Sequence, residues 1–440
     1  MLASDGRDQT LRLWETKEWS ARAVFQSDGF DPNFLPDGRT LMNGGAQGVR
    51  FWDVRAADAW VLRGHHSDVY PVLLSPDGAT IYSGGWDAYA GYPGSLRFWD
   101  AVTGEEIAAV GDADSYVRAA ALSADGSRLA ISLASEVKPS RIDILDTTTG
   151  AIVARVSGVD ENREVRIDSL AMEFVGENLV WVDSIHGVGY RTDTRTGALR
   201  TSRKLFAGAR GNLYSRVAWS PDGAIVAVCN GGEPTIDLLD PQSLELVRRW
   251  PHGHSGLIYS VAFSPDSRRL VTTAEDGIAR VWDTATGARF HDLVGHASRV
   301  LCAAFSPDGK RIATGGHDHK VRLWDADTFD QVARLIGHES WVYSFAWRAD
   351  SQLLISGSGD STVRIWDTQP LMDRMQARRE RQAILAQVEP MVRRLFAELG
   401  DASKVAEKVK TDPSLGARAR QIALQVTLRI SLDRLNTSAP

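Results

Sequence analysis

Two features are scarce in this sequence: cysteines and long apolar runs. Its 440 residues include two cysteines, Cys229 and Cys302, which are too few for a disulfide framework or a four-ligand zinc site. No apolar run approaches the ~20 residues that a membrane-spanning helix needs. The first residues also lack the basic segment and apolar core of a signal peptide. These absences favour a reducing, cytoplasmic setting and a chain without a membrane segment.

Positive charge is also in deficit. The formal net charge of the chain is −6 at pH 7. A general nucleic-acid binder would be strongly basic, so we expect no nucleic-acid partner.

Motifs of common catalytic chemistry are missing as well. The sequence has no Gly-x-x-x-x-Gly-Lys-Ser/Thr loop, no Gly-x-Gly-x-x-Gly, no His-Glu-x-x-His and no Cys-x-x-Cys. The tract His317-Asp318-His319 suggests a metal only weakly, because flanking residues in a tight turn rarely converge on one ion. We therefore expect no catalytic, cofactor-binding or metal-binding residues, and no cofactor.

Tryptophan and glycine are abundant, with 14 and 39 residues, and many of the tryptophans are periodic. A strand-like run that ends in Trp before an acidic residue recurs, and weaker copies lack the Trp. The positions before the acid are Trp14, Trp52, Trp99, Leu145, Thr192, Leu239, Trp282, Trp324 and Trp366. Between them lie Ser-Pro-Asp-Gly-type turns and alternating runs, so each repeat predicts four short antiparallel strands. Four strands with a period of ~40–45 residues are typical of a propeller blade.

A fixed spacing links four residue types inside several repeats. A His precedes an Asp by 22 residues, a Ser or Thr lies four before that Asp, and a Trp follows it by six. The sets are His254, Thr272, Asp276 and Trp282; His296, Thr314, Asp318 and Trp324; and His338, Ser356, Asp360 and Trp366. His65, Ser83 and Asp87 keep the first two spacings, but Trp99 follows Asp87 by 12 residues, so this loop carries six inserted residues.

With these motifs, the sequence resembles the WD-repeat β-propeller family from residue 1 to about residue 368. The resemblance implies that each set of four residues is a structural tetrad, hydrogen-bonded from Trp to Ser/Thr to His to Asp inside a blade. A protease-like interpretation of the same Ser, His and Asp is disfavoured because the set recurs in at least four repeats, whereas an active site does not.

The number of blades depends on which segment closes the ring. If residues 19–25 supply the fourth strand of the last blade, the all-β propeller has eight blades, and residues 1–15 are a partial blade left over from an upstream truncation. The propeller then covers residues 16–368. The alternative is a seven-bladed ring closed by residues 60–63, with residues 1–53 left as the tail of an earlier propeller.

After Thr368 the apolar period changes from 2 to 3.6 residues, which predicts a small C-terminal helical segment over residues 369–440. Pro390 either kinks the first helix or opens a new one, Gly400 ends it, and Asp412-Pro413 is a start signal for the last helix. The basic run at 378–381 is interpreted as a solvated face, with docking onto the acidic propeller or onto an acidic partner as the alternative. This tail resembles bacterial WD-repeat proteins in which the propeller follows a serine/threonine kinase domain.

Candidate partner-binding residues lie in the loops that the family places on one face of the disc. Trp86 precedes the tetrad Asp87, and the insertion after it adds Tyr89 and Tyr92. Arg299 and Trp341 each follow a tetrad His by three residues. Exposed aromatic residues often dominate interfaces, although these side chains could equally pack on a neighbouring blade.

The sequence thus predicts a monomeric, non-catalytic scaffold that binds other proteins or peptides. One alternative is the regulatory C-terminal part of a larger serine/threonine kinase whose catalytic domain is not in this chain. The other is a propeller hydrolase, which the missing catalytic motifs disfavour.

Overall fold

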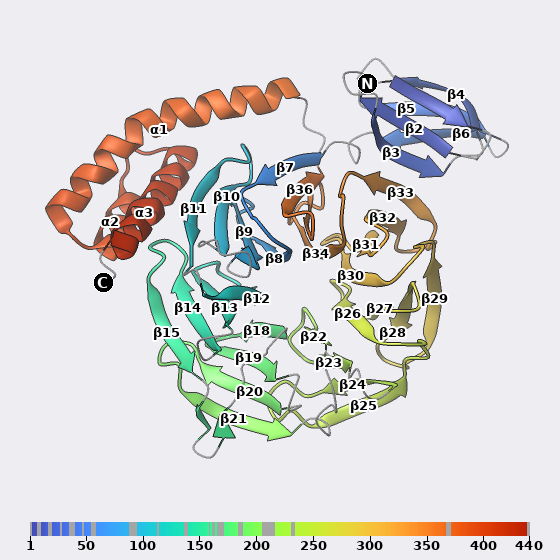
Figure 1. Cartoon of the computed structure of the whole chain (residues 1–440), viewed down its shortest axis with the longest axis horizontal. Coiled ribbons are helices and arrows are strands. Elements are labelled where there is room, and N and C mark those ends of the chain that lie inside the picture. Colours follow the sequence, from blue (N-terminus) through green and yellow to red (C-terminus); the bar gives the residue numbers. More distant parts are fainter. Residues whose placement is uncertain are drawn as a thin grey trace.

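The repeats fold into a ring of four-stranded antiparallel blades (Figure 1). The structure is a computed structural model. It describes the backbone except at residues 1, 7–9, 16–19, 27–28, 35–39, 46–47, 54–58, 88–94, 112–113, 136–139, 158, 161–162, 165–170, 184–187, 205–215, 230–233, 367–370 and 438–440. Side chains are described, outside these gaps, in residues 61–156, 172–181, 188–200, 202, 216–229, 234–366 and 380–434.

Seven blades follow one another along the chain, each with its first strand innermost. The first four are β8 (Val69–Leu74), β9 (Thr80–Gly85), β10 (Leu96–Asp100) and β11 (Glu106–Val110); β12 (Tyr116–Leu122), β13 (Arg128–Ala134), β14 (Arg141–Asp146) and β15 (Ile152–Ser157); β18 (Ala171–Val175), β19 (Asn178–Asp183), β20 (Val188–Asp193) and β21 (Leu199–Lys204); and β22 (Arg216–Trp219), β23 (Val226–Cys229), β24 (Thr235–Leu239) and β25 (Leu246–Pro251). The last three are β26 (Ile258–Phe263), β27 (Arg269–Ala274), β28 (Ile278–Asp283) and β29 (Arg289–Val294); β30 (Val300–Phe305), β31 (Arg311–Gly316), β32 (Lys320–Asp325) and β33 (Gln331–Ile336); and β34 (Val342–Trp347), β35 (Leu354–Ser358), β36 (Thr362–Trp366) and β7 (Ala59–Arg63). A short hairpin of β16 (Val159–Asp160) and β17 (Arg163–Glu164) precedes the third blade.

The seventh blade closes the ring with a strand from early in the chain. β7 pairs antiparallel with β36, from Thr362 opposite Arg63 to Trp366 opposite Ala59. The expected count of eight blades is therefore wrong, and the seven-bladed alternative is confirmed. Residues 20–25 and residues 60–63 both form strands, and both follow a Trp-acid repeat, so their pattern alone did not show which of them meets β36.

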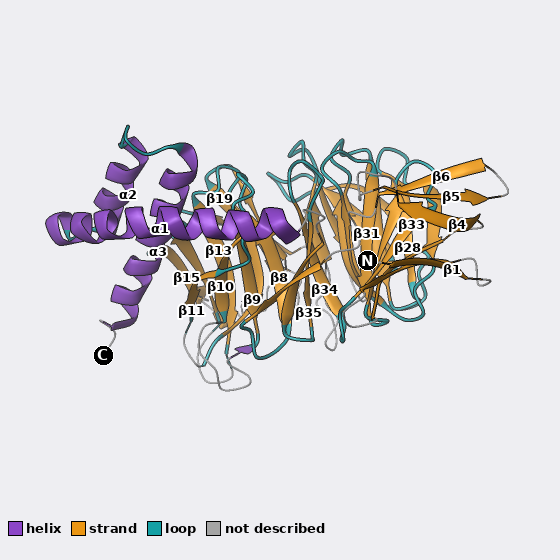
Figure 2. Cartoon of the chain, turned by 90° about the horizontal axis from the view of Figure 1, so that it is seen from above, coloured by secondary structure: helices purple, strands orange, loops and turns teal. Residues whose placement is uncertain are grey.

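The earlier strands lie outside the ring. β1 (Leu2–Gly6), β2 (Thr10–Glu15) and β3 (Ser20–Gln26) form a meander, and β3 pairs with the outer strand of the sixth blade, where Ala23 faces Leu335. β4 (Gly29–Phe34), β5 (Thr40–Gly45) and β6 (Gly48–Asp53) form a separate three-stranded sheet. The helices and these strands flank the seventh blade, the helices at the left and the strands at the right in both views (Figures 1 and 2).

The apolar side chains of each blade pack against the next blade. Trp366 and Leu354 of the seventh blade, for example, share a buried cluster with Leu323 and Cys302 of the sixth. Cys302 and Cys229 are both buried, free thiols, and burial raises the pKa of each. They are small core residues.

Three helices follow the ring: α1 (Leu371–Leu399), α2 (Ala402–Thr411) and α3 (Ala417–Thr437). Pro390 lies inside α1, and Gly400 ends that helix with a φ of 67° and an N–H bond to the Phe396 carbonyl. The expected start at Asp412 is wrong, because α3 begins five residues later. The Asp412 carboxylate instead accepts hydrogen bonds from the backbone N–H and hydroxyl of Ser414, which makes a local turn.

α3 is buried on both sides, as its apolar sequence predicted. One side joins the core shared with α1 and α2, and on the other Leu428 and Leu432 pack with residues of the first two blades. Polar contacts also hold the helices to the propeller. The Arg381 guanidinium of α1 donates to Glu105 at 3.2 Å and to Gln425 at 2.9 Å, and its side chain is only 6% exposed. For Arg381 the solvated-face interpretation is wrong and docking onto the propeller is correct.

Candidate partner-binding site at the centre of the ring

The four predicted tetrads are continuous chains of hydrogen bonds. In the seventh blade Trp366 Nε1 donates to Ser356 Oγ at 2.8 Å, Ser356 Oγ lies 2.7 Å from His338 Nε2, and His338 Nδ1 lies 2.8 Å from Asp360 Oδ2. The sets that contain His65, His254 and His296 repeat this chain, with the corresponding distances between 2.5 and 3.0 Å.

Burial fixes the protonation of the tetrads. Desolvation is the main effect on His254, and it lowers the pKa of that imidazole to about 4 although Asp276 opposes it. Burial alone would raise the pKa of Asp318, but the hydrogen bond from His296 and its charge outweigh burial and lower that pKa to about 2. Near neutral pH the His is therefore neutral and the Asp ionised. The His donates from Nδ1 to the Asp and accepts at Nε2 from the hydroxyl, so every member has a partner.

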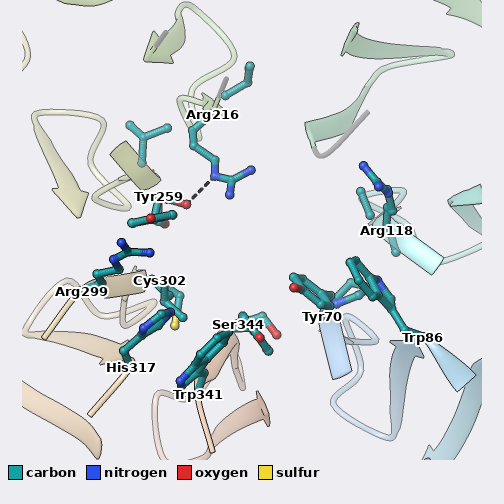
Figure 3. A pocket seen from close by; sticks show the side chains of 18 residues that line it. Tyr70, Trp86, Arg118, Arg216, Tyr259, Arg299, Cys302, His317, Trp341 and Ser344 are labelled. Atoms are coloured by element: carbon teal, nitrogen blue, oxygen red, sulfur yellow. Dashed lines mark hydrogen bonds between the residues drawn. The ribbon is translucent and has the colours of Figure 1, made fainter. Parts of the chain in front are cut away.

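The residues predicted to bind a partner meet at the centre of the ring. Trp86, Arg299 and Trp341 all line one cavity of about 460 Å³ (Figure 3). Tyr89 and Tyr92, the other two candidates, lie outside the described residues.

Bulges in the innermost strands position six of the other described lining residues. The pairing register shifts after the first buried residue in β8, β26, β30 and β34, and after Val117 in β12. The residues without a cross-strand partner at these shifts are Tyr70 and Pro71, Arg118, Tyr259, Leu301 and Tyr343, and each of them lines the cavity. A bulge changes the direction of a side chain and interrupts the hydrogen bonds between the two strands at that point. These residues were not identified from the sequence, although each lies one or two positions into an inner strand.

Aromatic rings from the sixth, seventh and first blades form a continuous arc along one side of the cavity. His317 stacks on Trp341 at 3.9 Å between ring centroids, Trp341 meets Tyr343 edge-on, and Tyr343 stacks on Tyr70 at 4.2 Å. Tyr70 in turn stacks on Trp86 at 4.8 Å. We call His317, Trp341, Tyr343, Tyr70 and Trp86 the aromatic arc. Trp341 is its most accessible described member, with 41% of its surface exposed.

Among the described residues of the lining, the charged side chains are three arginines, Arg118, Arg216 and Arg299. Arg118 lies 5.9 Å from the Trp86 ring centroid, Arg216 donates from Nε to the Tyr259 carbonyl, and Arg299 forms an ion pair with Glu275. Burial and the nearby charge of Arg299 lower the pKa of His317, so this ring is neutral near pH 7.

The described residues contain no group of three His, Cys, Asp or Glu side chains placed to hold a metal ion. Among the described helices, none combines the length and the apolar character needed to cross a membrane.

Four segments of the chain, residues 58–100, 245–283, 287–325 and 329–367, match the WD domain, G-beta repeat family. The chain is 33% identical over 237 residues to actin-interacting protein 1 of Drosophila melanogaster, which covers 50% of this chain and 34% of that protein. It is 33% identical over 75 residues to transducin beta-like protein 2 of Homo sapiens, which covers 17% of this chain and 15% of that protein. The chain thus spans about a third or less of the length of these relatives.

The first matched segment begins beside β7, the strand that closes the ring, and ends with the Trp99-Asp100 pair. In these four segments the chain is similar to WD repeats, and the tetrads and strand pairing there are those of propeller blades. The chain has seven blades and carries three C-terminal helices.

Proposed function

We propose that the protein is a non-catalytic scaffold that binds a segment of a partner protein in the cavity at the centre of the ring. The proposal rests on one observation: the aromatic arc lines the cavity and is partly exposed. Bulges in β8 and β34 direct Tyr70 and Tyr343 toward the cavity, beside the exposed Trp341. Large rigid rings supply contact area at low entropic cost and are enriched in interface hot spots. WD-repeat relatives support the same role, and one of them is named for its interaction with actin.

The test replaces one arc residue and one matched exposed aromatic elsewhere. Trp341→Ala removes the most accessible ring of the arc, and Phe290→Ala removes a ring that is 49% exposed on the outer strand β29. Partners captured from a native lysate are quantified by mass spectrometry for the unmodified protein and both variants. We expect Trp341→Ala to deplete specific partners and Phe290→Ala to retain them. An unchanged partner profile for Trp341→Ala would place the binding surface elsewhere.

Three further proposals accompany this function. The protein acts as a monomer, which light scattering of the purified chain tests, and it works in the cytoplasm, which imaging of a tagged copy tests. The third is that it serves as the regulatory part of a larger serine/threonine kinase, as its resemblance to kinase-linked propellers suggests. Sequencing the gene in frame on both sides tests that proposal.

A further inference from the structure

The charge of the cavity is opposite to that of the chain. The protein carries a net charge of −6, yet the 18 described residues that line the cavity include three arginines and no Asp, Glu or Lys. Two acids contact residues of the lining. Glu275 pairs with Arg299, and Asp68 accepts a hydrogen bond from the Tyr343 hydroxyl at 3.1 Å. The charged side chains of the described lining are therefore all positive, with Arg299 partly offset by Glu275, on a protein of net negative charge.

The arginines and the aromatic arc occupy different parts of the wall. Arg216 and Arg299 come from the side of the fourth to sixth blades, and Figure 3 shows them facing Tyr70 and Trp86 across the open centre. The bond from Arg216 Nε to the Tyr259 carbonyl fixes the plane of that guanidinium. Arg118 approaches from the second blade beside Trp86. A ligand in the centre thus meets guanidinium groups on two sides and aromatic faces between them.

We propose that the cavity selects an acidic peptide segment, in which a carboxylate-bearing side chain reaches the arginines while a neighbouring apolar or aromatic side chain packs on the arc. This inference rests on the proposed function and names the chemistry of its partner. Planar guanidinium groups match carboxylate geometry, and their charge-assisted hydrogen bonds are stronger than neutral ones.

Two alternative ligands share part of this chemistry. A phosphorylated side chain presents the same negative charge to the arginines. Single-stranded nucleic acid also uses arginines and stacking rings, but it needs a basic groove that follows its backbone, and this cavity is a confined pocket on an acidic protein. The acidic peptide fits the described residues better.

The test measures the binding of fluorescein-labelled synthetic peptides to the full chain by anisotropy. All peptides share one sequence of Leu, Tyr and Ser residues around a central pair, which is Glu-Glu, Gln-Gln or phosphoserine-Ser. A labelled oligothymidine is a fourth probe. We expect the Glu-Glu peptide to bind at least about tenfold more tightly than the Gln-Gln peptide, and its affinity to fall as salt rises.

Variants locate the binding. Arg216→Gln and Arg299→Gln, tested singly, should each weaken the Glu-Glu peptide by about tenfold or more. The matched control is Arg249→Gln, which removes an ion-paired arginine from the outer strand β25 and should change nothing. Arg299 is the safer substitution for folding because 44% of its side chain is exposed, and thermal melting of each variant verifies the fold.

Each outcome decides a separate point. Equal binding of Glu-Glu and Gln-Gln peptides would overturn the acidic selectivity and leave the scaffold function standing. Binding of the phosphoserine peptide alone would replace the carboxylate by a phosphorylated segment, and binding of oligothymidine alone would overturn the peptide ligand. Binding by none of the probes also overturns the inference, whereas the scaffold function fails only if Trp341→Ala retains every partner.

Discussion

At the scale of single residues, the tetrads show how much a spacing can reveal. The sequence placed His, Ser or Thr, Asp and Trp at constant intervals, and the structure joins them because each interval spans a fixed number of strands and turns. The lining of the cavity was only partly predictable. Trp86, Arg299 and Trp341 were found from their loop positions, but Tyr343 and Arg118 face the cavity through bulges that depend on pairing between strands.

Asp360→Ala should destabilise the propeller. The Asp360 carboxylate accepts from His338 and from the Glu339 backbone N–H, and a buried donor left without its acceptor costs about 1–3 kcal/mol. We expect a lower melting temperature by differential scanning calorimetry. Asp327→Ala is the control, because the Asp327 side chain is 80% exposed and should change melting little. Equal melting of both variants would show that the tetrad contributes nothing to stability.

Acid should weaken the fold from about pH 6.5 downward. The pKa of His254 is about 4 in the folded protein, whereas that of a solvated histidine is 6.5. Between these limits the unfolded chain binds more protons, so stability falls with falling pH. The contribution of this one residue should drop by about 2 kcal/mol between pH 7 and pH 5. Asp318, with a lowered pKa of about 2, adds a loss in the same direction only below about pH 4.

Urea unfolding at pH 7 and pH 5 measures this effect. His254→Gln removes the titrating group and should give a smaller difference between the two pH values, although it is less stable than the unmodified protein at pH 7. A variant with the full pH dependence would assign the acid sensitivity to other groups.

At the scale of elements, the strands were easier to predict than the helix boundaries. Alternating apolar residues and Gly-containing turns specify strands locally. By contrast, the start of α3 depends on whether the Asp412 side chain caps a helix or closes a local turn. In the structure it closes a turn with Ser414. The docking of the helices could not be read from the sequence, because Leu428 and Leu432 could face either a partner or the propeller.

Gly150→Ala should loosen the contact between α3 and the second blade. Gly150 has a φ of 70°, and an added Cβ would lie 2.2 Å from Leu432 Cδ2. Gly223→Ala is a matched control, since its φ is 71° and nothing lies within 4 Å of the added Cβ. Both variants carry the backbone cost of about 1–2 kcal/mol, and overpacking should cost Gly150→Ala about 1–3 kcal/mol more.

Hydrogen exchange measured by mass spectrometry distinguishes the two effects. Faster exchange in α3 for Gly150→Ala, but not for Gly223→Ala, is the expected result. If α3 exchanges alike in both, its packing against the blade does not depend on Gly150.

At the scale of the whole molecule, the decisive feature is the strand that closes the ring. The repeats predicted the propeller but not its closure, because two strand segments near the N-terminus each follow a Trp-acid repeat. Tertiary pairing selects β7, whose Leu62 is buried in a cluster with Val363 and Ile365 of β36.

Removal of residues 1–53 should therefore leave a folded ring, since β7 stays in the chain. Removal of residues 1–63 takes away the closing strand and the buried Leu62, and it leaves β36 with an unpaired edge. We expect a cooperative thermal transition for the shorter deletion and a lower, broader one for the longer deletion, followed by circular dichroism. A collapse of the fold in the shorter deletion would mean that β1–β6 are needed for the ring.

The closing pair also determines how the ring responds to tension along its own chain. Ala59, where β7 begins, is paired with Trp366, where β36 ends. A pull on the two flanking segments therefore acts on the same end of the ladder, and it separates the hydrogen bonds one after another instead of shearing them together. The propeller should open at low force in a single-molecule pulling experiment, with the seventh blade giving way first.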